Sequence, residues 1–294
     1  MRVAALLPAA TDIVIALGAG DQLVAVTHAC VVPPPLDGVP RVTRSRVVGA
    51  TAPALDAHVS DLASAGAPMF DIDEALLVAQ HPDVILTQAV CEVCAVREAD
   101  ARAVAGRLQP PARVATLGAS TVEGILADIL NVARALDLAD EGEELVLGLR
   151  SRIAAIHRRL KAEQAPRPSV LVLEWTDPPF NAGHWVPDMV RRAGGQEVLG
   201  KIGEISRRVS IEEIQSAKPE VVMIAPCGYT LADAMREVSP WPESRSTPAW
   251  VIDANRLTSS PGPGVIRGIE VLAQILHPAL FGSPSRQDAV QITP

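Results

Sequence analysis

Four cysteines are the residues of this sequence best suited to bind a metal. Cys30, Cys91, Cys94 and Cys227 each come shortly after an apolar segment that we predict to be a strand. Four thiolates can hold zinc or an iron-sulfur cluster, although one Cys-x-x-Cys pair with two separate cysteines is a weak signal. Free Cys is also among the most buried residue types. Two interpretations stay open: a four-cysteine metal site with His28 as an optional fifth ligand, or free thiols that line a cleft or lie buried.

Aromatic residues make up only 3% of the chain, yet Trp175, Phe180 and Trp185 fall within one short segment rich in Pro and Gly. The polar residues between them are Asp177, Asn181 and His184. Clustered rings in such a loop favour a stacking surface for a flat ligand, because polar residues are unfavourable in a dry core. The alternative is that the rings fill the core beneath the loop.

Several other polar residues follow predicted strands or precede helices. His28 and His184 can bind a metal as neutral imidazoles, although a lone histidine is more often simply hydrogen-bonded. Arg44 and Arg46 can donate to carboxamide or phosphate oxygens, or lie in a solvated loop. Asn255 precedes a Pro- and Gly-rich corner at a helix start. No nucleophile elbow, phosphate-binding loop, dinucleotide fingerprint or zinc-protease motif is present, so the sequence offers no assembled catalytic centre.

Short apolar segments alternate with helical patterns in the first half. We predict strands at residues 3–7, 23–26, 84–86 and 114–117, with a polar corner at Thr11-Asp12 before a helix at 13–17. Asp73 is the expected N-cap of a helix at 74–80. Helical spacing then predicts two successive helices, over 120–136 and 139–162, of which the second is long enough to connect two domains.

The second half repeats the pattern of the first. Ser210 begins a capping box, and Pro219 precedes a strand at 221–224. The interval from Ser210 to Pro219 equals the interval from Asp73 to Pro82. Further elements are expected at 170–173, a strand, and 265–276, a helix. Alternating strands and helices predict parallel sheets covered on both faces, whose ligands bind at the carboxyl ends of the strands.

These elements predict an α/β fold of two Rossmann-like lobes with parallel central sheets, joined by one long rigid helix, with a ligand cleft between the lobes. The expected boundaries are 1–118 for the N-terminal lobe, 119–166 for the helical bridge, 167–283 for the C-terminal lobe and 284–294 for a tail. A chain of 294 residues is large enough for two such cores.

Charge and composition limit the classes of partner that the protein can bind. A net charge of -8 argues against nucleic acid or an anionic membrane as the main partner. No apolar stretch approaches the length of a spanning helix. The first residues lack the pattern of a signal peptide, so we expect a cytoplasmic protein, or a periplasmic one if the chain was trimmed. We expect a monomer.

Motifs spread over about residues 2–283 resemble the cobalamin-binding substrate-binding proteins of ABC transporters, which are related to iron-siderophore binders. They are Leu6 to Val14, His28-Ala29-Cys30, Thr87-Gln88 before Cys91-x-x-Cys94, Glu174-Trp175-x-Asp177-Pro178, Gly183-x-Trp185-Val186-Pro187, Ala225 to Gly228, and Pro261-Gly262-Pro263. The sequence departs from related ones at Ser259 and Ser260, where an aromatic residue and Asn-Arg are expected.

The resemblance implies a binding protein and no enzyme, with cobalamin or a related corrinoid held between two lobes, for an ABC permease or for delivery to a corrinoid-dependent enzyme. The ligand contacts expected from the residues and the resemblance together are Thr11, His28, Arg44, Arg46, Gln88, Trp175, Asp177, Phe180, Asn181, His184, Trp185, Tyr229 and Asn255. The alternative function is a zinc or iron-sulfur protein that uses the four cysteines.

Overall fold

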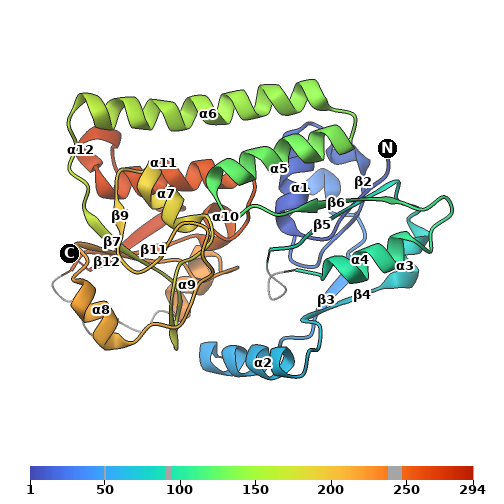
Figure 1. Ribbon diagram of the computed structural model, residues 1–294, viewed down its shortest axis with the longest axis horizontal. Helices are drawn as coiled ribbons and strands as arrows, with labels where there is room; N and C mark the ends of the chain where they lie inside the picture. Colours follow the sequence, from blue (N-terminus) through green and yellow to red (C-terminus); the bar gives the residue numbers. More distant parts are fainter. Residues whose placement is uncertain (50, 91–94, 238–246, 294) are drawn as a thin grey trace. The chain divides into compact units, whose positions relative to one another are not determined.

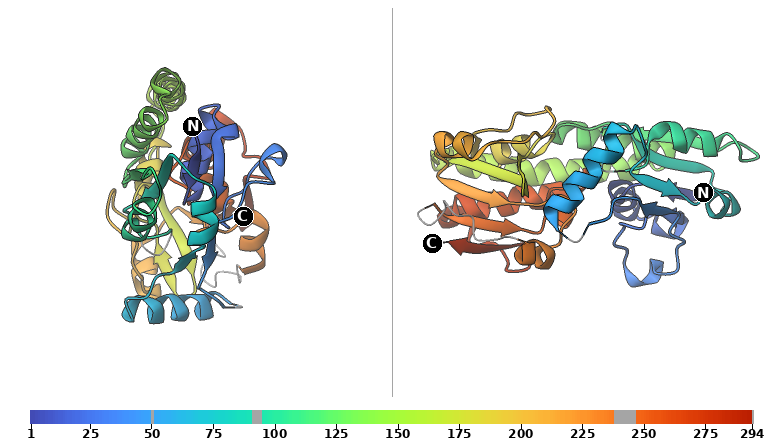
Figure 2. Two further views of the ribbon diagram at one scale, coloured as in Figure 1. Left: turned by 90° about the vertical axis from the view of Figure 1, so that its right-hand side faces the viewer. Right: turned by 90° about the horizontal axis from the view of Figure 1, so that it is seen from below.

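The computed structural model describes residues 1–49, 51–90, 95–237 and 247–293. The chain divides into two compact units (Figure 1 and Figure 2). The first unit consists of Met1–Ala119 and Glu123–Leu147, and the second consists of Ser120–Val122 and Gly148–Pro294. Each unit contains its own sheet with parallel strands and flanking helices, as the alternating pattern predicts.

The sheet of the first unit is fully parallel, with the strand order β2-β1-β5-β6. Its strands are β1 (Val3–Ala5), β2 (Leu23–Val26), β5 (Val84–Gln88) and β6 (Arg113–Leu117). One core cluster packs Leu6 and Ile85 with Leu77 of a neighbouring helix. Because both faces of a parallel sheet are covered, strands such as β1 and β2 are short, continuous apolar runs.

The helices of the first unit are α1 (Pro8–Ala16), α2 (Ala52–Ser64), α3 (Glu74–Ala79) and α4 (Glu98–Ala105). Short 3-10 turns lie at η1 (Gly20–Gln22) and η2 (Pro34–Leu36), and β3 (Thr43–Ser45) pairs antiparallel with β4 (Phe70–Ile72). Two long helices follow, α5 (Val122–Ala135) and α6 (Ala139–Ala162). The bounds of α6 are those expected from helical spacing, and its residues belong to both units.

The second unit has a mixed sheet with the order β12-β11-β10-β7-β8, and β9 also pairs with β7. Its strands are β7 (Ser169–Thr176), β8 (Pro179–Asn181), β9 (Gln196–Glu197), β10 (Val221–Ile224), β11 (Ala249–Ile252) and β12 (Ala289–Thr293). The three central strands β7, β10 and β11 are parallel, whereas β8 and β12 run antiparallel at the two edges. The sequence predicted β7 and β10 but not β11.

Helices lie on both sides of this second sheet (Figure 1). They are α7 (Val186–Arg192), α8 (Ile211–Ala217), α9 (Leu231–Glu237), α10 (Ala254–Leu257), α11 (Gly264–Leu276) and α12 (Pro278–Phe281). Leu171, Leu173 and Ile224 pack with residues of α8 and α9 in one core cluster. Alternate residues of the strands therefore face α8 and α9, because successive side chains of a strand point to opposite faces.

Local capping signals explain why the two halves share one pattern. The Asp73 side chain accepts a hydrogen bond from the Leu76 backbone N–H at 2.9 Å, so it caps α3 as predicted. Ser210 and Glu213 form the predicted capping box of α8, with both reciprocal bonds present. Such caps satisfy backbone donors that have no partner within the helix.

Two expectations about local structure are wrong. Helix α1 begins at Pro8 and includes Thr11 and Asp12, so there is no polar corner at these residues. Proline is favourable in the first turn because it lacks the N–H that would have no partner. Residues expected to form a tail contain strand β12, which pairs with β11.

Candidate ligand-binding site

Three loops at the carboxyl ends of parallel strands meet in the second unit. The first includes the last residues of β7 and the start of the turn after it, and the other two follow β10 and β11. We call the surface formed by residues 174–177, 225–229 and 253–259 the carboxyl edge. The backbone N–H of Cys227 donates to the Glu174 carbonyl at 3.0 Å, and that of Asn255 donates to the Tyr229 carbonyl at 2.9 Å. The Gly228 N–H donates to the Ser259 hydroxyl at 2.9 Å. These bonds fix the three loops to one another.

An aromatic pair stands on this carboxyl edge. The rings of Trp175 and Tyr229 meet edge to face, with centroids 5.4 Å apart and planes at 80°. Both rings are half-buried, and the Trp175 indole N–H is buried with no hydrogen-bond partner among the described residues. An unpartnered buried donor costs about 1–3 kcal/mol, which a ligand acceptor that reached this group would recover. Burial, with the Glu237 and Asp233 carboxylates, raises the pKa of Tyr229, so its hydroxyl stays protonated.

The β7–β8 hairpin extends the same surface. Phe180 lies opposite Trp175 in the antiparallel register, and the Arg208 guanidinium carbon lies 5.7 Å from the centre of the Phe180 ring. Asp177 is exposed in the turn between the two strands. The structure therefore brings Trp175, Tyr229, Asn255 and Cys227 together and places Phe180 and Asp177 on the adjoining hairpin.

Two of the expected ligand contacts, Asn181 and Trp185, are packed beneath the carboxyl edge. We call this buried layer the base of the site. Asn181 is 3% exposed, its amide donates to the Leu199 carbonyl at 3.1 Å, and its oxygen accepts from the Arg207 N–H at 2.8 Å. Trp185 is 9% exposed, and its indole N–H donates to the Thr258 carbonyl at 2.7 Å. A structural role is favoured for both side chains over the expected ligand contact, because their polar groups already have partners and their surfaces are buried.

A loop at residues 199–206 packs closely against the segment that carries these residues. A Cβ on Gly183 would lie 2.3 Å from the Ser206 nitrogen, and a Cβ on Gly200 would lie 2.3 Å from the Ala182 carbonyl oxygen. Only glycine permits such approaches without displacing backbone. The Gly183 of the sequence motif is therefore needed for packing of this loop.

Two side chains with shifted pKa values lie along that packed loop. Burial raises the pKa of Glu174, against hydrogen bonds from Ser206 and the Gly183 N–H. Burial lowers the pKa of His184, whose Nε2 is buried without a hydrogen-bond partner in the described part of the chain. His184 is therefore neutral at pH 7, and its backbone bonds to residues 203 and 204 hold it against the loop. The sequence analysis missed the Glu174 carboxyl, although it precedes Trp175 in the motif.

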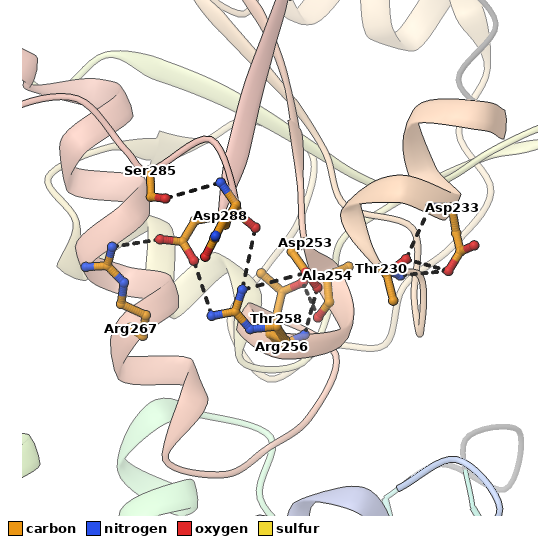
Figure 3. Close-up of polar contacts among 10 residues, drawn as sticks. Thr230, Asp233, Asp253, Ala254, Arg256, Thr258, Arg267, Ser285 and Asp288 are labelled. Atoms are coloured by element: carbon orange, nitrogen blue, oxygen red, sulfur yellow. Dashed lines mark hydrogen bonds and ion pairs between the residues drawn. The ribbon is translucent and has the colours of Figure 1, made fainter. Parts of the chain in front are cut away.

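An ionic network holds the segment that follows β11 (Figure 3). The Asp253 carboxylate caps α10 by accepting from the Arg256 N–H at 3.1 Å. Asp288, whose side chain is 6% exposed, receives Arg256 at 3.4 Å and Arg267 at 2.8 Å. The residues near the C-terminus therefore fix the loop that carries Asn255 and Ser259.

The first unit places other expected residues at the carboxyl ends of its own strands. His28 is exposed, and its Nδ1 lies 2.8 Å from the Thr43 hydroxyl, while its ring lies 5.7 Å from that of Phe70. Burial and the Arg41 charge lower the pKa of His28, so it is neutral. Arg41 also donates to the carbonyl of Cys30 at 2.7 Å and of Thr27 at 3.0 Å. The loop that carries His28 is therefore held in place.

The remaining residues of the first unit differ in exposure. Thr11 is buried, with its hydroxyl 3.1 Å from the Cys30 sulfur, and Gln88 is buried at the end of β5. Arg44 and Arg46 are exposed, and each lies 3.8 Å from a carboxylate oxygen of Asp71. Thr11 contacts a protein atom, whereas the two arginines are open to solvent.

The cysteines do not assemble a site within the described residues. Cys30 is buried and Cys227 is exposed, both as free thiols. Burial raises the pKa of Cys30, so its thiol is protonated at neutral pH. Cys91 and Cys94 lie outside the described residues. Among those described, no group of three or more His, Cys, Asp or Glu is arranged to hold a metal ion. The four-cysteine site stays a prediction.

Comparison with protein families and solved structures identifies the kind of protein. Residues 3–249 match the model of one family, described as periplasmic binding protein. The chain belongs to this family. No curated protein matches the chain. Because the family is one of binding proteins, the chain is a binding protein and not an enzyme, as expected.

Solved structures share the fold along nearly the whole chain. A periplasmic heme binding protein from Pseudomonas aeruginosa is 18% identical, with a TM-score of 0.73, and the match covers 100% of this chain and 98% of that one. The heme binding protein HutB of Vibrio cholerae is 20% identical, with a TM-score of 0.68 and coverage of 95% and 99%. The vitamin B12 binding protein BtuF of Vibrio cholerae is 19% identical, with a TM-score of 0.62 and coverage of 94% and 96%.

These matches settle the coarse expectations and leave the ligand open. At such identities they show the fold alone, an α/β fold of two lobes with parallel sheets, as predicted. The expected cytoplasmic location is not supported by a family described as periplasmic. Within the described residues, no helix is long and apolar enough to cross a membrane.

Proposed function

We propose that this periplasmic binding protein binds a corrinoid such as cobalamin and delivers it to an ABC permease. One observation carries the proposal: the Trp175–Tyr229 pair offers ring surface at the carboxyl edge, with a buried indole N–H that has no partner among the residues the structure describes. Aromatic pairs and flat ligands stack favourably, and a nearby donor can orient the ligand.

The charge of the edge favours a corrinoid over haem. Corrinoids carry neutral carboxamides around the ring, whereas haem carries two carboxylates. The Trp175 indole, the Tyr229 hydroxyl and the Asn255 amide are neutral groups that suit carboxamides. The exposed Asp177 carboxylate can accept from an amide N–H but repels a carboxylate. The matched heme and vitamin B12 binding proteins support a tetrapyrrole ligand in general.

Residues of the first unit complete the proposal. We expect the exposed His28, Arg44 and Arg46 to contact the ligand, the arginines through its phosphate and carboxamide oxygens. Gln88 is a weaker candidate because it is 8% exposed. Delivery outside the cytoplasm fits the family better than the location expected from the first residues.

The test is a calorimetric titration of the purified protein with cobalamin and, separately, with haemin. Trp175→Ala is expected to weaken cobalamin binding about tenfold or more, since loss of a ring contact costs about 1–3 kcal/mol. Trp175→Phe is expected to lose less. Trp250→Phe is the control, because Trp250 lies within β11 rather than at its carboxyl end.

Three outcomes contradict the proposal in different ways. Tight haemin binding without cobalamin binding contradicts the corrinoid, and equal affinity of Trp175→Ala and wild-type protein contradicts the site. Bound iron or zinc after purification, lost when Cys91 and Cys94 are replaced by Ser, supports the four-cysteine alternative instead.

A further inference from the structure

A basic segment stands out in an acidic chain. Residues 150–167, which cover the end of α6 and the connection to β7, contain six Arg or Lys and one acidic residue, Glu163. The whole chain has a net charge of -8. Basic residues near the end of a helix counter its dipole, which explains one or two of them. The same segment also borders a pocket, which the dipole does not explain.

This pocket has a volume of about 330 Å³ and lies within the second unit, between the end of α6 and the end of α7. Its apolar wall includes Ile153 and Leu160. Its cationic lining consists of Lys161, Arg167, Arg191 and Arg192, and His157 lies beside them. Pockets that bind small molecules combine an apolar wall with a few polar groups in this way.

The positive charge of the pocket is only partly neutralised. Asp188, whose side chain is 3% exposed, receives Arg191 at 2.5 Å and Arg192 at 3.1 Å. Its second oxygen also accepts the Val122 N–H at 3.2 Å. One carboxylate therefore faces two guanidinium groups.

The other two cations have no carboxylate partner among the described residues. Arg167 donates to the carbonyls of Gly195 at 2.9 Å and Arg191 at 3.3 Å, which orients its guanidinium without neutralising it. Lys161 makes no hydrogen bond or ion pair to the part of the chain that the structure describes. The pocket therefore carries a surplus of more than one positive charge beside an apolar wall.

We infer that this pocket binds a small organic phosphate, with the phosphate between Lys161 and the arginines and the organic part against Ile153 and Leu160. A phosphate monoester carries between one and two negative charges at pH 7, which matches the surplus better than a single carboxylate does. Guanidinium groups also bind phosphate oxygens in a directed way. The pocket is formed by helices α6 and α7 and uses none of the residues proposed to contact the corrinoid.

Calorimetric titration with phenyl phosphate tests this inference on the full chain at low ionic strength. Lys161→Gln is expected to weaken binding roughly tenfold, since a charge-assisted hydrogen bond is lost and the side chain has no partner to leave behind. The matched control is Arg158→Gln, an exposed residue of the same helix that does not line the pocket. It is expected to leave the affinity within about twofold, as an exposed charge contributes little.

The apolar wall is tested by inorganic phosphate, which is expected to bind several-fold more weakly than phenyl phosphate because it lacks an apolar part. The inference is overturned by absence of phenyl phosphate binding at millimolar concentration, or by equal losses in Lys161→Gln and Arg158→Gln, which would indicate diffuse attraction. It is also overturned if vesicles of anionic phospholipid bind the protein while phenyl phosphate does not.

Discussion

Glu197 makes the stability of the second unit depend on pH to an extent that can be measured. Its carboxyl accepts backbone N–H groups of Val172 at 3.1 Å and of Leu199 and Gly200 at 3.2 Å each. Burial nevertheless raises its pKa from 4.5 to about 7, because the hydrogen bonds only partly offset the loss of hydration. The folded protein therefore binds this proton more tightly than the unfolded chain does.

The sign and size of the effect follow from this shift. A raised carboxyl pKa in the folded state stabilises the fold fully below the unfolded pKa of 4.5, and this stabilisation is lost as the pH rises through about 7. At about 1.4 kcal/mol for each pKa unit, the free energy of unfolding falls by about 2–3 kcal/mol between about pH 5 and pH 8 from this group alone.

Urea denaturation of wild-type protein and Glu197→Gln at both pH values isolates this contribution. Other titrating groups are common to both proteins, so the difference between their pH dependences reports Glu197. The amide of Gln stays neutral at both pH values. The change in the free energy of unfolding between them is therefore expected to be smaller in Glu197→Gln by about 2–3 kcal/mol. Glu163→Gln, at an exposed position, is the control and is expected to behave as wild type. Identical pH dependence of the wild type and Glu197→Gln would refute the reasoning.

Further predictions concern the base of the site and its thiols. Asn181→Ala is expected to lower the free energy of unfolding by about 2 kcal/mol in urea titration, because two partly buried backbone groups lose their partner; a change below about 0.5 kcal/mol would contradict a structural role. Trp185→Phe keeps a ring but loses the bond to the Thr258 carbonyl, so a loss of about 1–3 kcal/mol is expected in the same assay. Cys227 is expected to react with a thiol reagent in the native protein before Cys30, which is buried with a raised pKa; mass spectrometry of the labelled protein reads the order.

Elements with local signals were predictable from sequence. The bounds of α6, the Asp73 cap and the Ser210 capping box all depend on residues within a few positions of one another, and the structure confirms them. The antiparallel edge strand β12 was missed because its pairing is not local. This strand pairs with β11 across the whole of α11, and no short pattern encodes that contact.

The site was predictable as a segment but not residue by residue. The sequence placed the rings of residues 175–185 in a loop after a strand at 170–173, whereas Trp175 lies within β7 and Phe180 within β8. Spacing does not reveal that Trp185 bonds to Thr258, which lies 73 positions later in the chain. Asn181 likewise has its partners on a later loop. A polar residue in an aromatic loop is equally compatible with a ligand contact or a buried clamp until those partners are known.

In the second unit, polar groups that already make hydrogen bonds stabilise the fold, whereas a polar group without a partner is a candidate for ligand binding. Asn181 and Trp185 already make their hydrogen bonds in the folded chain, so a ligand gains nothing from them, and their loss lowers stability. The Trp175 N–H makes none, so an acceptor on a ligand can recover the roughly 1–3 kcal/mol that burial of this donor costs. Variants at Asn181 and Trp185 should therefore change the free energy of unfolding, whereas variants at Trp175 should change affinity with little loss of stability. An equal loss of stability in Trp175→Phe and Trp185→Phe, without a change in affinity, would place Trp175 in the base as well.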